Sequence, residues 1–526
     1  MPTYQADRKI SDPALNPGDA PYFAAAERSV LAIKRCKACK QAHHYPRSIC
    51  PFCWSDEVDW DDAKGTGEIY TFSVTRRGAG APYCIAYVKL DEGPTMLANI
   101  VDTDLDAVKI GQAVRVVFMK SEGGMSIPMF TPIGERDMTG CVALYSAVDD
   151  VITHYEVDVE AATLTEKSKT RMPAKVQYAW PHPSRRHLYV STSTGGPRVP
   201  SSDNFLSAFA IGPDGRLTPQ GKDAQLSRRA VHMCIDPSGR FALNGHNFPA
   251  SGITVNRIEA DGSVGAEIAQ SAPLDYGIYP HQVMVFPSAA KALIVDRGNK
   301  LQGEKAEEPG ALRSFGLTDG ALSEGQVVAP NGGHGFGARH VDFHPSLPCL
   351  YVSDERTNHL YMFRCPGDIL EAEPTCTLKT LAEPNNLRPR QIAGPIHVHP
   401  SGRCVYVANR ADYSVEHGSA KVFGGGENNI AVYSIDHATG EPKLVQHANT
   451  QSFHVRTFAC DPSGRLLVAA SIKAHAVLDG DQITPVPAAL SVFRIRDDGR
   501  LVFVRKYDVP TSGSQLQYWM GMVGLG

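Results

Sequence analysis

The chain has 526 residues, of which 42% are hydrophobic, and it carries 52 basic and 56 acidic side chains. This length exceeds one ordinary hydrophobic core, so more than one domain is expected. The near balance of charge gives no electrostatic reason to expect nucleic acid or an anionic membrane surface as a partner, which leaves small molecules and other proteins. Residues 1–20 lack the apolar core of a signal peptide, and no later apolar run is long enough to span a bilayer, which favours a cytoplasmic location.

The first predicted element is a helix over residues 22–34, where apolar side chains recur at helical spacing. Two C-x2-C pairs come next, Cys36 with Cys39 and Cys50 with Cys53. Four thiolates at this spacing can converge on one zinc ion, whereas a redox dithiol, the rival interpretation, needs only one pair. Because four thiolates leave no coordination position open for water, we expect this zinc to be structural.

Four short strand-like runs follow Gly65, separated by turns that contain glycine. They cover residues 68–74, 84–90, 96–100 and 113–119, and they predict a small antiparallel barrel. The polar, turn-prone segment 131–139 follows the last run. We place a domain boundary there, which divides the chain into residues 1–135 and 136–526.

Several short motifs lie in this first part: Arg35-Cys36, Pro46-Arg47, Cys50-Pro51, Gly65-Thr66-Gly67, Leu90-Asp91-Glu92-Gly93-Pro94 and Gly111-Gln112-Ala113-Val114. With these motifs, residues 18–133 resemble the zinc-ribbon/OB-fold family of acyl-CoA-associated proteins. That family accompanies thiolases, hydratases or aldolases that act on coenzyme A thioesters. The resemblance therefore implies acyl-CoA, or a thiolase-like or hydratase-like protein, as a partner. An OB-type barrel could instead bind single-stranded nucleic acid, which the acidic residues Asp91 and Glu92 disfavour.

From residue 140 onward, a turn phrase with Pro, Ser and Gly leads repeatedly into an apolar run of strand length. The prolines of the phrase recur at intervals of between 50 and 62 residues, at Pro183, Pro237, Pro287, Pro345, Pro400 and Pro462. A repeat near fifty residues in a strand-rich sequence predicts a propeller, and counting the apolar strand pairs gives seven blades. The predicted fold class is all-β, a seven-bladed β-propeller preceded by a zinc ribbon and a small OB-type barrel.

The predicted blades carry polar side chains at strand ends, where the strand pattern does not require them. Because equivalent strand ends of all blades lie on one face, we expect four of these side chains to share a pocket: His281, Arg339, Glu355 and Arg410. His281 and Glu355 could then move protons, while the two arginines hold a carboxylate or an oxyanion. Alternatively, His281 is a hydrogen-bonded core residue and Glu355 only pairs with Arg339. His182, His344 and His399 begin turns and are expected to be structural.

Two insertions interrupt the repeats, at residues 299–309 and 413–429. Long loops of this kind form lids over sites or are simple surface excursions. In the first case His417 and Lys421 would reach the ligand. The glycines at 424–426 are not a phosphate-binding loop, because the Lys-Ser/Thr ending and the following helix are missing.

The motifs Pro280-His281-Gln282, Ala338-Arg339-His340, Ser353-Asp354-Glu355 and Ala408-Asn409-Arg410, with the turn repeat, resemble the lactonase family of seven-bladed propellers. This family contains bacterial 6-phosphogluconolactonases and fungal carboxymuconate cyclases, and the resemblance covers residues 140–510. It implies catalytic roles for His281, Arg339, Glu355 and Arg410. It also implies supporting or substrate-binding roles for a second set, namely Gln282, Asp296, Arg297, His340, Arg356, Asn409 and Arg456. The family usually has proline where this chain has Ala338 and Val455.

The leading hypothesis is a lactone hydrolase in which His281, alone or with Glu355, activates water while Arg339 and Arg410 bind the oxyanion and an anionic substrate group. No catalytic metal is expected. A cycloisomerase that forms or opens a lactone on a carboxylated diene would use the same residues. A third hypothesis is a propeller scaffold without catalysis that the N-terminal module docks onto a thiolase-like or hydratase-like protein.

Overall fold

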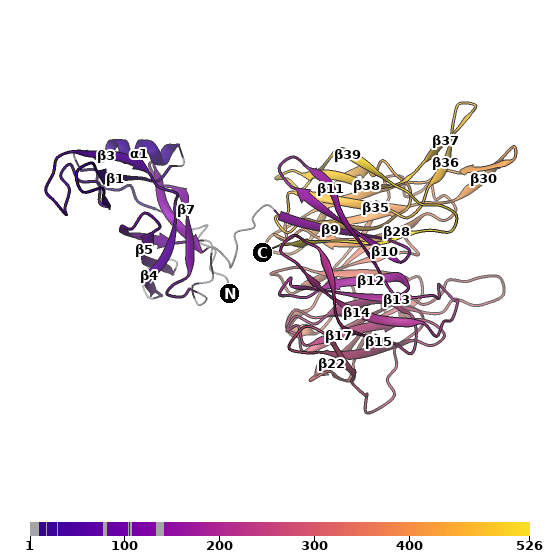
Figure 1. Ribbon diagram of the computed structural model, residues 1–526. Coiled ribbons are helices and arrows are strands. Elements are labelled where there is room, and N and C mark those ends of the chain that lie inside the picture. Colours follow the sequence, from indigo (N-terminus) through magenta and orange to yellow (C-terminus); the bar gives the residue numbers. More distant parts are fainter. Residues whose placement is uncertain are drawn as a thin grey trace. The chain divides into compact units, whose positions relative to one another are not determined.

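The computed structural model describes residues 10–16, 18–28, 30–76, 82–101, 103, 105, 108–132 and 141–525. These residues form two compact units, one on each side of residues 133–140 (Figure 1). The predicted boundary between residues 135 and 136 lies outside the described residues. Within the described ranges, no helix has both the length and the apolar character that crossing a bilayer requires.

The first unit begins with the helix α1 (Ala20–Glu27) and a three-stranded sheet in the order β2-β1-β3. Its strands are β1 (Ala32–Cys36), β2 (Ala42–His43) and β3 (Val58–Asp62). The predicted helix over residues 22–34 is therefore wrong in its second half. There the chain is extended, and it pairs with β3 from Ala32 opposite Asp62 to Cys36 opposite Val58. Strand pairing across the ribbon thus overrides the helical spacing of the apolar residues.

The predicted barrel is present and closes in the order β4-β5-β6-β8-β7. Its strands are β4 (Thr66–Thr75), β5 (Tyr83–Leu90), β6 (Thr95–Ile100), β7 (Ala113–Lys120) and β8 (Ser126–Pro132). The sequence did not reveal β8, whose run contains Pro128 and Pro132. β8 joins β6 in parallel through Ile100 and Phe130, so the barrel is not purely antiparallel. One apolar core, including Tyr22, Ile33 and Val88, is shared by helix, ribbon and barrel.

The second unit consists of seven four-stranded sheets, which confirms the predicted seven blades. Blade 1 contains β40 (Gln517–Gly524), β9 (Cys141–Val148), β10 (Val151–Asp158) and β11 (Thr163–Arg171), and blade 2 contains β12 (Lys175–Pro181), β13 (His187–Ser193), β14 (Asn204–Ile211) and β15 (Leu217–Gln225). Blade 3 contains β16 (Ala230–Ile235), β17 (Phe241–His246), β18 (Gly252–Ile258) and β19 (Val264–Glu267). Blade 4 contains β20 (Pro280–Val285), β21 (Lys291–Asp296), β22 (Ala311–Thr318) and β23 (Ala321–Val328).

Blade 5 contains β24 (Ala338–Phe343), β25 (Cys349–Asp354), β26 (His359–Arg364) and β27 (Cys376–Lys379). Blade 6 contains β28 (Ile392–Val398), β29 (Cys404–Arg410), β32 (Asn429–Ile435) and β33 (Pro442–Asn449). Blade 7 contains β34 (Val455–Cys460), β35 (Leu466–Ser471), β38 (Ala488–Ile495) and β39 (Leu501–Val509). Two further hairpins project from blades 6 and 7 (Figure 1), formed by β30 (Ser414–His417) with β31 (Ala420–Phe423) and by β36 (His475–Asp479) with β37 (Gln482–Val486).

Blade 1 is completed by the end of the chain. β40 pairs with β9 from Gln517 opposite Val148 to Gly524 opposite Val142, so the first and last strands of the propeller share one sheet. This closure was not predicted, because β40 is not preceded by the repeated turn phrase. The ring is therefore closed by pairing between the first and last strands of the propeller itself.

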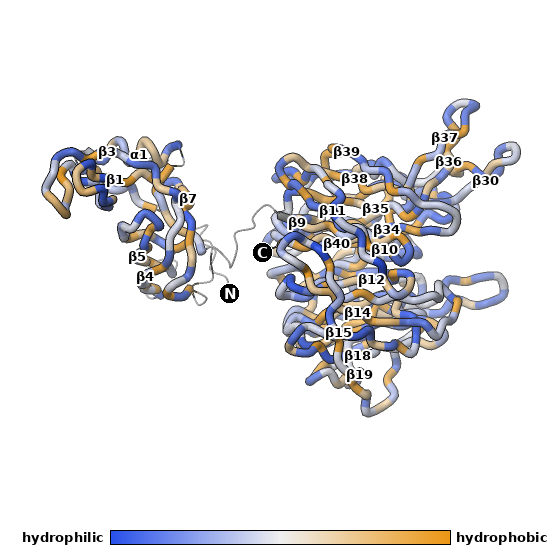
Figure 2. Tube along the Cα trace, viewed as in Figure 1, coloured by the Kyte–Doolittle hydropathy of each residue, from blue (hydrophilic) through white to orange (hydrophobic). Residues whose placement is uncertain are grey.

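The core of the propeller lies between neighbouring blades. Each of the seven interfaces has its own apolar cluster, for example Val142 with Val468 between blades 1 and 7, and Leu350 with Val295 between blades 5 and 4. In Figure 2 the hydrophobic colour follows strands such as β35 and β38, whereas the projecting loops are mainly hydrophilic. Closing the ring therefore buries the two blade faces that an open array would expose.

The repeated turn phrase links three pairs of neighbouring blades. The imidazole Nε2 of His399 lies 2.8 Å from the carbonyl oxygen of Gly464, and His344 and His182 contact Gly402 and Gly239 in the same way at 3.0 Å. Gly464 has a φ of 69°, a conformation that favours glycine. These contacts confirm that the three turn histidines are structural.

Candidate functional site

The innermost strand of every blade contains a β-bulge at the same level. In blade 4, Pro280 lies opposite Asp296 and Gln282 opposite Val295, which leaves His281 as the extra residue. By the same register, the extra residues of four other blades are Tyr518, Gln177, Arg339 and Arg456. Blade 3 has Val231 there, and blade 6 has Gly394 and Pro395 opposite Ala408. Bulges redirect side chains, and these surround the axis of the propeller, where the innermost strands converge.

Glu355 follows β25 and lies among three guanidinium groups. Its Oε1 accepts a hydrogen bond from Nη1 of Arg297 at 2.8 Å, and its Oε2 accepts one from Nη2 of Arg410 at 3.2 Å. Nε of Arg339 lies 2.9 Å from Oε2 as an ion pair. Burial alone would raise the pKa of Glu355, but Arg297, Arg410 and Arg339 lower it to about 2. Glu355 is therefore ionised at neutral pH and fixes the positions of the three cations.

His281 lies beside this cluster. Its ring is 5.0 Å from the ring of His340, whose Nδ1 is 3.2 Å from Nη1 of Arg339. Nδ1 of His281 is buried and has no hydrogen-bond partner among the described residues. Burial, together with the nearby Arg339 and Arg456, holds the pKa of His281 well below its ordinary value. The imidazole is therefore neutral at pH 7, and its Nδ1 is not engaged by another described group.

The structure thus brings the four predicted catalytic residues into one group. Arg339 and Arg410 both contact Glu355, and His281 reaches them through His340. Arg410 also extends the group into blade 7, since its Nη1 lies 3.3 Å from Nε2 of His454. The four side chains are therefore neighbours, while their expected opening into one common pocket and their chemical roles stay predictions.

A pocket of about 330 Å³ reaches this group at Glu355, whereas His281, Arg339 and Arg410 do not belong to its lining. Glu355 and Arg297 line it together with five further charged residues, Arg198, Lys300, Arg356, Arg388 and Arg390. Arg390 is paired with Asp412, and Arg356 with Glu307. Arg198, Lys300 and Arg388 have no carboxylate within 4 Å among the described residues. The lining is therefore strongly cationic, which suits an anionic ligand.

Three residues predicted to bind substrate make several hydrogen bonds within the fold. Gln282 exchanges two hydrogen bonds with the backbone of Val341. Asp296 accepts hydrogen bonds from the backbone of Ile278 and Gly298 and from Arg313, and burial raises its pKa to about 6. Asn409 donates to the carbonyl of Thr380 and to Asn429. These contacts favour a structural role for all three over the predicted substrate contact.

The predicted lids have different forms. Residues 299–308 fold into a narrow excursion with isolated bridges from Asn299 to Glu308 and from Gln302 to Lys305, and its first residues line the pocket. The other insertion forms the hairpin β30–β31. Both His417 and Lys421 are exposed there, and neither belongs to the pocket lining, so contact with a ligand is not favoured.

Two residues near the axis were not predicted. Tyr518 belongs to the unpredicted strand β40, and the guanidinium of Arg456 lies 3.8 Å from the centre of its ring. Arg229 precedes β16 and is only 4% exposed. It donates to Gln177 at 2.9 Å and to Asn247 at 3.2 Å, both neutral acceptors. Aligning the innermost strands by their bulges would have found Tyr518, because His281, Arg339 and Arg456 occupy the equivalent position.

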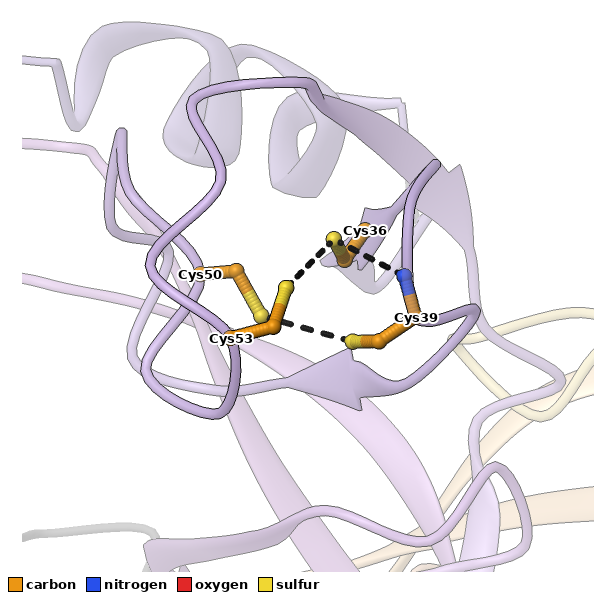
Figure 3. A group of neighbouring side chains, drawn as sticks. All are labelled: Cys36, Cys39, Cys50 and Cys53. Carbon is orange, nitrogen blue, oxygen red and sulfur yellow. Dashed lines mark hydrogen bonds between the residues drawn. The ribbon is translucent and has the colours of Figure 1, made fainter.

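The predicted metal site lies in the N-terminal unit. The sulfur atoms of Cys36, Cys39, Cys50 and Cys53 all lie within 4.8 Å of one another, and two pairs are 3.6 Å apart (Figure 3). A tetrahedral zinc with Zn–S bonds of about 2.3 Å places its sulfur ligands about 3.8 Å apart. Backbone amides of Cys39 and Phe52 point at Cys36 and Cys50, a contact that stabilises thiolates. The four residues therefore fit one structural zinc ion.

Three known families match the chain. Residues 23–59 match the ChsH2 rubredoxin-like zinc ribbon domain, and residues 60–119 match the ChsH2 C-terminal OB-fold domain. Residues 139–478 match the family described as Lactonase, 7-bladed beta-propeller. The zinc ribbon match agrees with the four-cysteine cluster, and the propeller match agrees with the seven blades.

Individual relatives cover one unit or the other. The 6-phosphogluconolactonase of Bacillus subtilis is 24% identical over 357 residues, which are 65% of this chain and 91% of that protein. The "Probable enoyl-CoA hydratase alpha subunit" of Thermomonospora curvata is 35% identical over 124 residues, 23% of this chain and 39% of that protein. The structure of the periplasmic gluconolactonase of Pseudomonas aeruginosa covers 74% of this chain and 100% of its own at 18% identity, with a TM-score of 0.53. With the family match spanning more than half of its length, the chain belongs to the lactonase family of seven-bladed β-propellers, preceded here by a zinc ribbon and an OB-fold domain.

Proposed function

We propose that the propeller hydrolyses a small lactone that carries an anionic group. Two features carry this proposal: a neutral imidazole at His281 beside the arginine cluster, and a cationic pocket that reaches the same cluster at Glu355. Water must lose a proton when it attacks the ring carbonyl, and the carbonyl oxygen then becomes negative. A base beside fixed positive charges meets both needs.

In this mechanism His281 takes the proton from the attacking water. Arg339 and Arg410 stabilise the negative charge on the carbonyl oxygen without moving, because Glu355 already holds them. Glu355 is less suited to be the base, because guanidiniums already occupy both of its carboxylate oxygens, whereas Nδ1 of His281 has no partner among the described residues. The sequence-based hypothesis allowed Glu355 to share proton transfer, and its contacts favour the role of an anchor.

The substrate class follows from the pocket. Arg198, Lys300 and Arg388 provide positive charge at its outer part, so a phosphate or carboxylate remote from the lactone ring could bind there. The relatives named 6-phosphogluconolactonase support a phosphorylated aldonolactone as the first candidate. Carboxylated muconolactones are the second, because the same cations suit a carboxylate.

The test is acid release from purified protein with a panel of phosphorylated aldonolactones, neutral aldonolactones and muconolactones. We expect hydrolysis of an anionic lactone and a loss of about 10²-fold or more in kcat for His281→Asn. His417→Asn, in the exposed hairpin, is the matched control and should keep full activity. If no lactone is opened while a muconate-type acid is cyclised, the protein is a cycloisomerase.

For the N-terminal unit we propose docking to an acyl-CoA-processing protein. Tyr70, Tyr87 and Leu97 are exposed on the adjacent strands β4, β5 and β6, and Tyr87 lies directly opposite Leu97. An exposed apolar patch of this kind commonly marks a protein interface. The 35% identity to the hydratase subunit relative supports a hydratase-like partner, and a thiolase-like partner is the alternative that the sequence resemblance implies.

This docking can be tested by gel filtration with purified hydratase-like and thiolase-like subunits from the same organism. Tyr87→Asp should abolish coelution, whereas Val327→Asp, at an equally exposed apolar position of the propeller, should not. Coelution that survives Tyr87→Asp would place the interface elsewhere.

A further inference from the structure

The side of the ring opposite Glu355 contains positive charge without a carboxylate. Glu355 and its arginines belong to blades 4, 5 and 6, whereas Arg229, Arg456 and Tyr518 come from blades 3, 7 and 1. Among the described residues, no carboxylate lies within 4 Å of Arg229 or Arg456. Buried guanidiniums normally have an anionic partner, so this side is suited to a group that becomes negative during a reaction.

Tyr518 is the group these cations surround. Gln517 and Trp519, its neighbours in β40, are 0% and 4% exposed and pack into the blade interfaces, while the bulge leaves Tyr518 unpaired with β9. The Arg456 guanidinium covers one face of its ring at 3.8 Å. This arrangement holds the phenol at the same level of the axis as His281.

The electrostatic surroundings make this phenol unusually acidic. Burial alone would raise the pKa of Tyr518, but Arg456, Arg229 and Arg339 lower it below its ordinary value. Other buried tyrosines of the propeller, such as Tyr178 and Tyr406, have raised pKa values. Among the tyrosines in the described part of the chain whose pKa departs from the ordinary value, Tyr518 is the one whose pKa is lowered.

His281 and Tyr518 lie three blades apart in the ring of seven, on opposite sides of the axis. Opening a lactone needs a base for the incoming water and an acid for the departing ring oxygen. We propose that Tyr518 donates the proton to that ring oxygen, a role that rests on the proposed lactone hydrolysis.

The step balances without a further reactant. The water oxygen bonds to the carbonyl carbon as one water proton passes to His281. The bond between carbonyl carbon and ring oxygen then breaks, its electron pair stays on the oxygen, and the Tyr518 proton passes to that oxygen. Arg456 and Arg229 stabilise the phenolate, which regains a proton from the His281 imidazolium through solvent. The product is the hydroxy acid.

The test compares two leaving groups in the variant Tyr518→Phe. An aliphatic lactone such as δ-gluconolactone releases a poor leaving group that needs an acid, whereas dihydrocoumarin releases a phenolate that does not. We expect kcat for the aliphatic lactone to fall by about 10²-fold with KM unchanged, and kcat for dihydrocoumarin to stay near that of the wild type. Tyr361→Phe, at a half-buried position in blade 5, is the control.

The outcomes separate the two proposals. Wild-type protein that opens neither of these lactones nor any anionic lactone of the panel contradicts lactone hydrolysis itself. Active wild type with equal losses for both lactones, or with a raised KM for both, assigns Tyr518 to substrate binding and overturns its role as the acid. The pH profile gives a second readout, because the alkaline decline of the wild-type rate should be absent in Tyr518→Phe. Since the phenyl ring still stacks under Arg456, the variant should keep the wild-type thermal unfolding midpoint.

Discussion

Arg339 is 1% exposed, and its charge is balanced by Glu355, whose Oε2 lies 2.9 Å from the arginine Nε. The same carboxylate also contacts Arg297 and Arg410. One negative charge therefore compensates three positive charges in a largely buried place. Such a cluster is sensitive to the loss of its single anion.

Glu355→Gln should destabilise the propeller by about 3–5 kcal/mol, because it leaves buried guanidiniums without a counter-charge. Since the pKa of Glu355 is lowered from its ordinary 4.5 to about 2, its contribution is complete above pH 4.5 and is lost as the pH falls toward 2. Urea denaturation at pH 7 measures the loss. Glu324→Gln, at an exposed position in β23, should leave the midpoint unchanged. Equal midpoints for the two variants would contradict the anchoring role.

On its acidic side, the pH profile of kcat/KM should begin to decline only below pH 6.5. The proposed base must be unprotonated, and burial with Arg339 and Arg456 lowers the pKa of His281 below 6.5, so activity is lost as the pH falls through that lower value. Arg456→Met removes one of these cations, so the pKa of His281 should rise and the acidic decline of the profile (its acid limb) should move to higher pH. Lys421→Met, in the exposed hairpin, should leave the limb in place. An acid limb above pH 6.5 in the wild type would argue against His281 as the base.

Lys300→Ala and Arg388→Ala should each raise KM for an anionic lactone by about tenfold, the effect of losing one charge-assisted hydrogen bond. Both side chains line the pocket without a carboxylate partner among the described residues. A neutral lactone should show no change, and added salt should raise KM for the anionic lactone alone. Lys421→Ala is the control. Equal effects on charged and neutral substrates would mean that these residues shape the pocket instead of binding an anion.

Removing zinc should unfold the ribbon and spare the propeller. Cys39→Ser or a strong chelator opens the four-thiolate site, and structural zinc commonly contributes about 10 kcal/mol or more to a small domain. We expect one zinc per chain in the wild type by metal analysis, none in Cys39→Ser, and unchanged lactone hydrolysis in both. Cys376→Ser, which changes a cysteine of the propeller, should leave the protein with one zinc per chain. Loss of hydrolysis on chelation would assign the metal a role beyond the ribbon.

Much of the fold could be predicted from the sequence, because each blade repeats the same local chemistry. The turn at Gly464 and the apolar run from Leu466 recur with little change, so periodicity alone shows the propeller. β40 lacks this turn phrase, and only the pairing with β9 shows that it completes blade 1. The helix over residues 22–34 was half wrong because residues 32–36 gain more from pairing with β3 than from continuing the helix.

The residues of the candidate site could be predicted where a charged or polar side chain interrupts an apolar strand pattern. His281, Arg339 and Glu355 interrupt strand patterns that do not need them, and the structure gathers them. Gln282 and Asn409 stood out for the same reason, but their hydrogen bonds to backbone groups depend on neighbouring strands that are distant in sequence. Tyr518 did not stand out, since a tyrosine in an apolar strand looks like a core residue. Only the shared bulge register places it level with His281.

The sharing of blade 1 between β9 and β40 also orders events during translation. A nascent chain that has left the ribosome as far as blade 7 still lacks residues 517–524, so its ring stays open with two unsatisfied blade edges. The zinc ribbon and barrel, by contrast, are complete once the first 132 residues have emerged. Folding of the ribbon and barrel can therefore precede that of the catalytic unit, and Tyr518 reaches the axis in the same event that closes the ring.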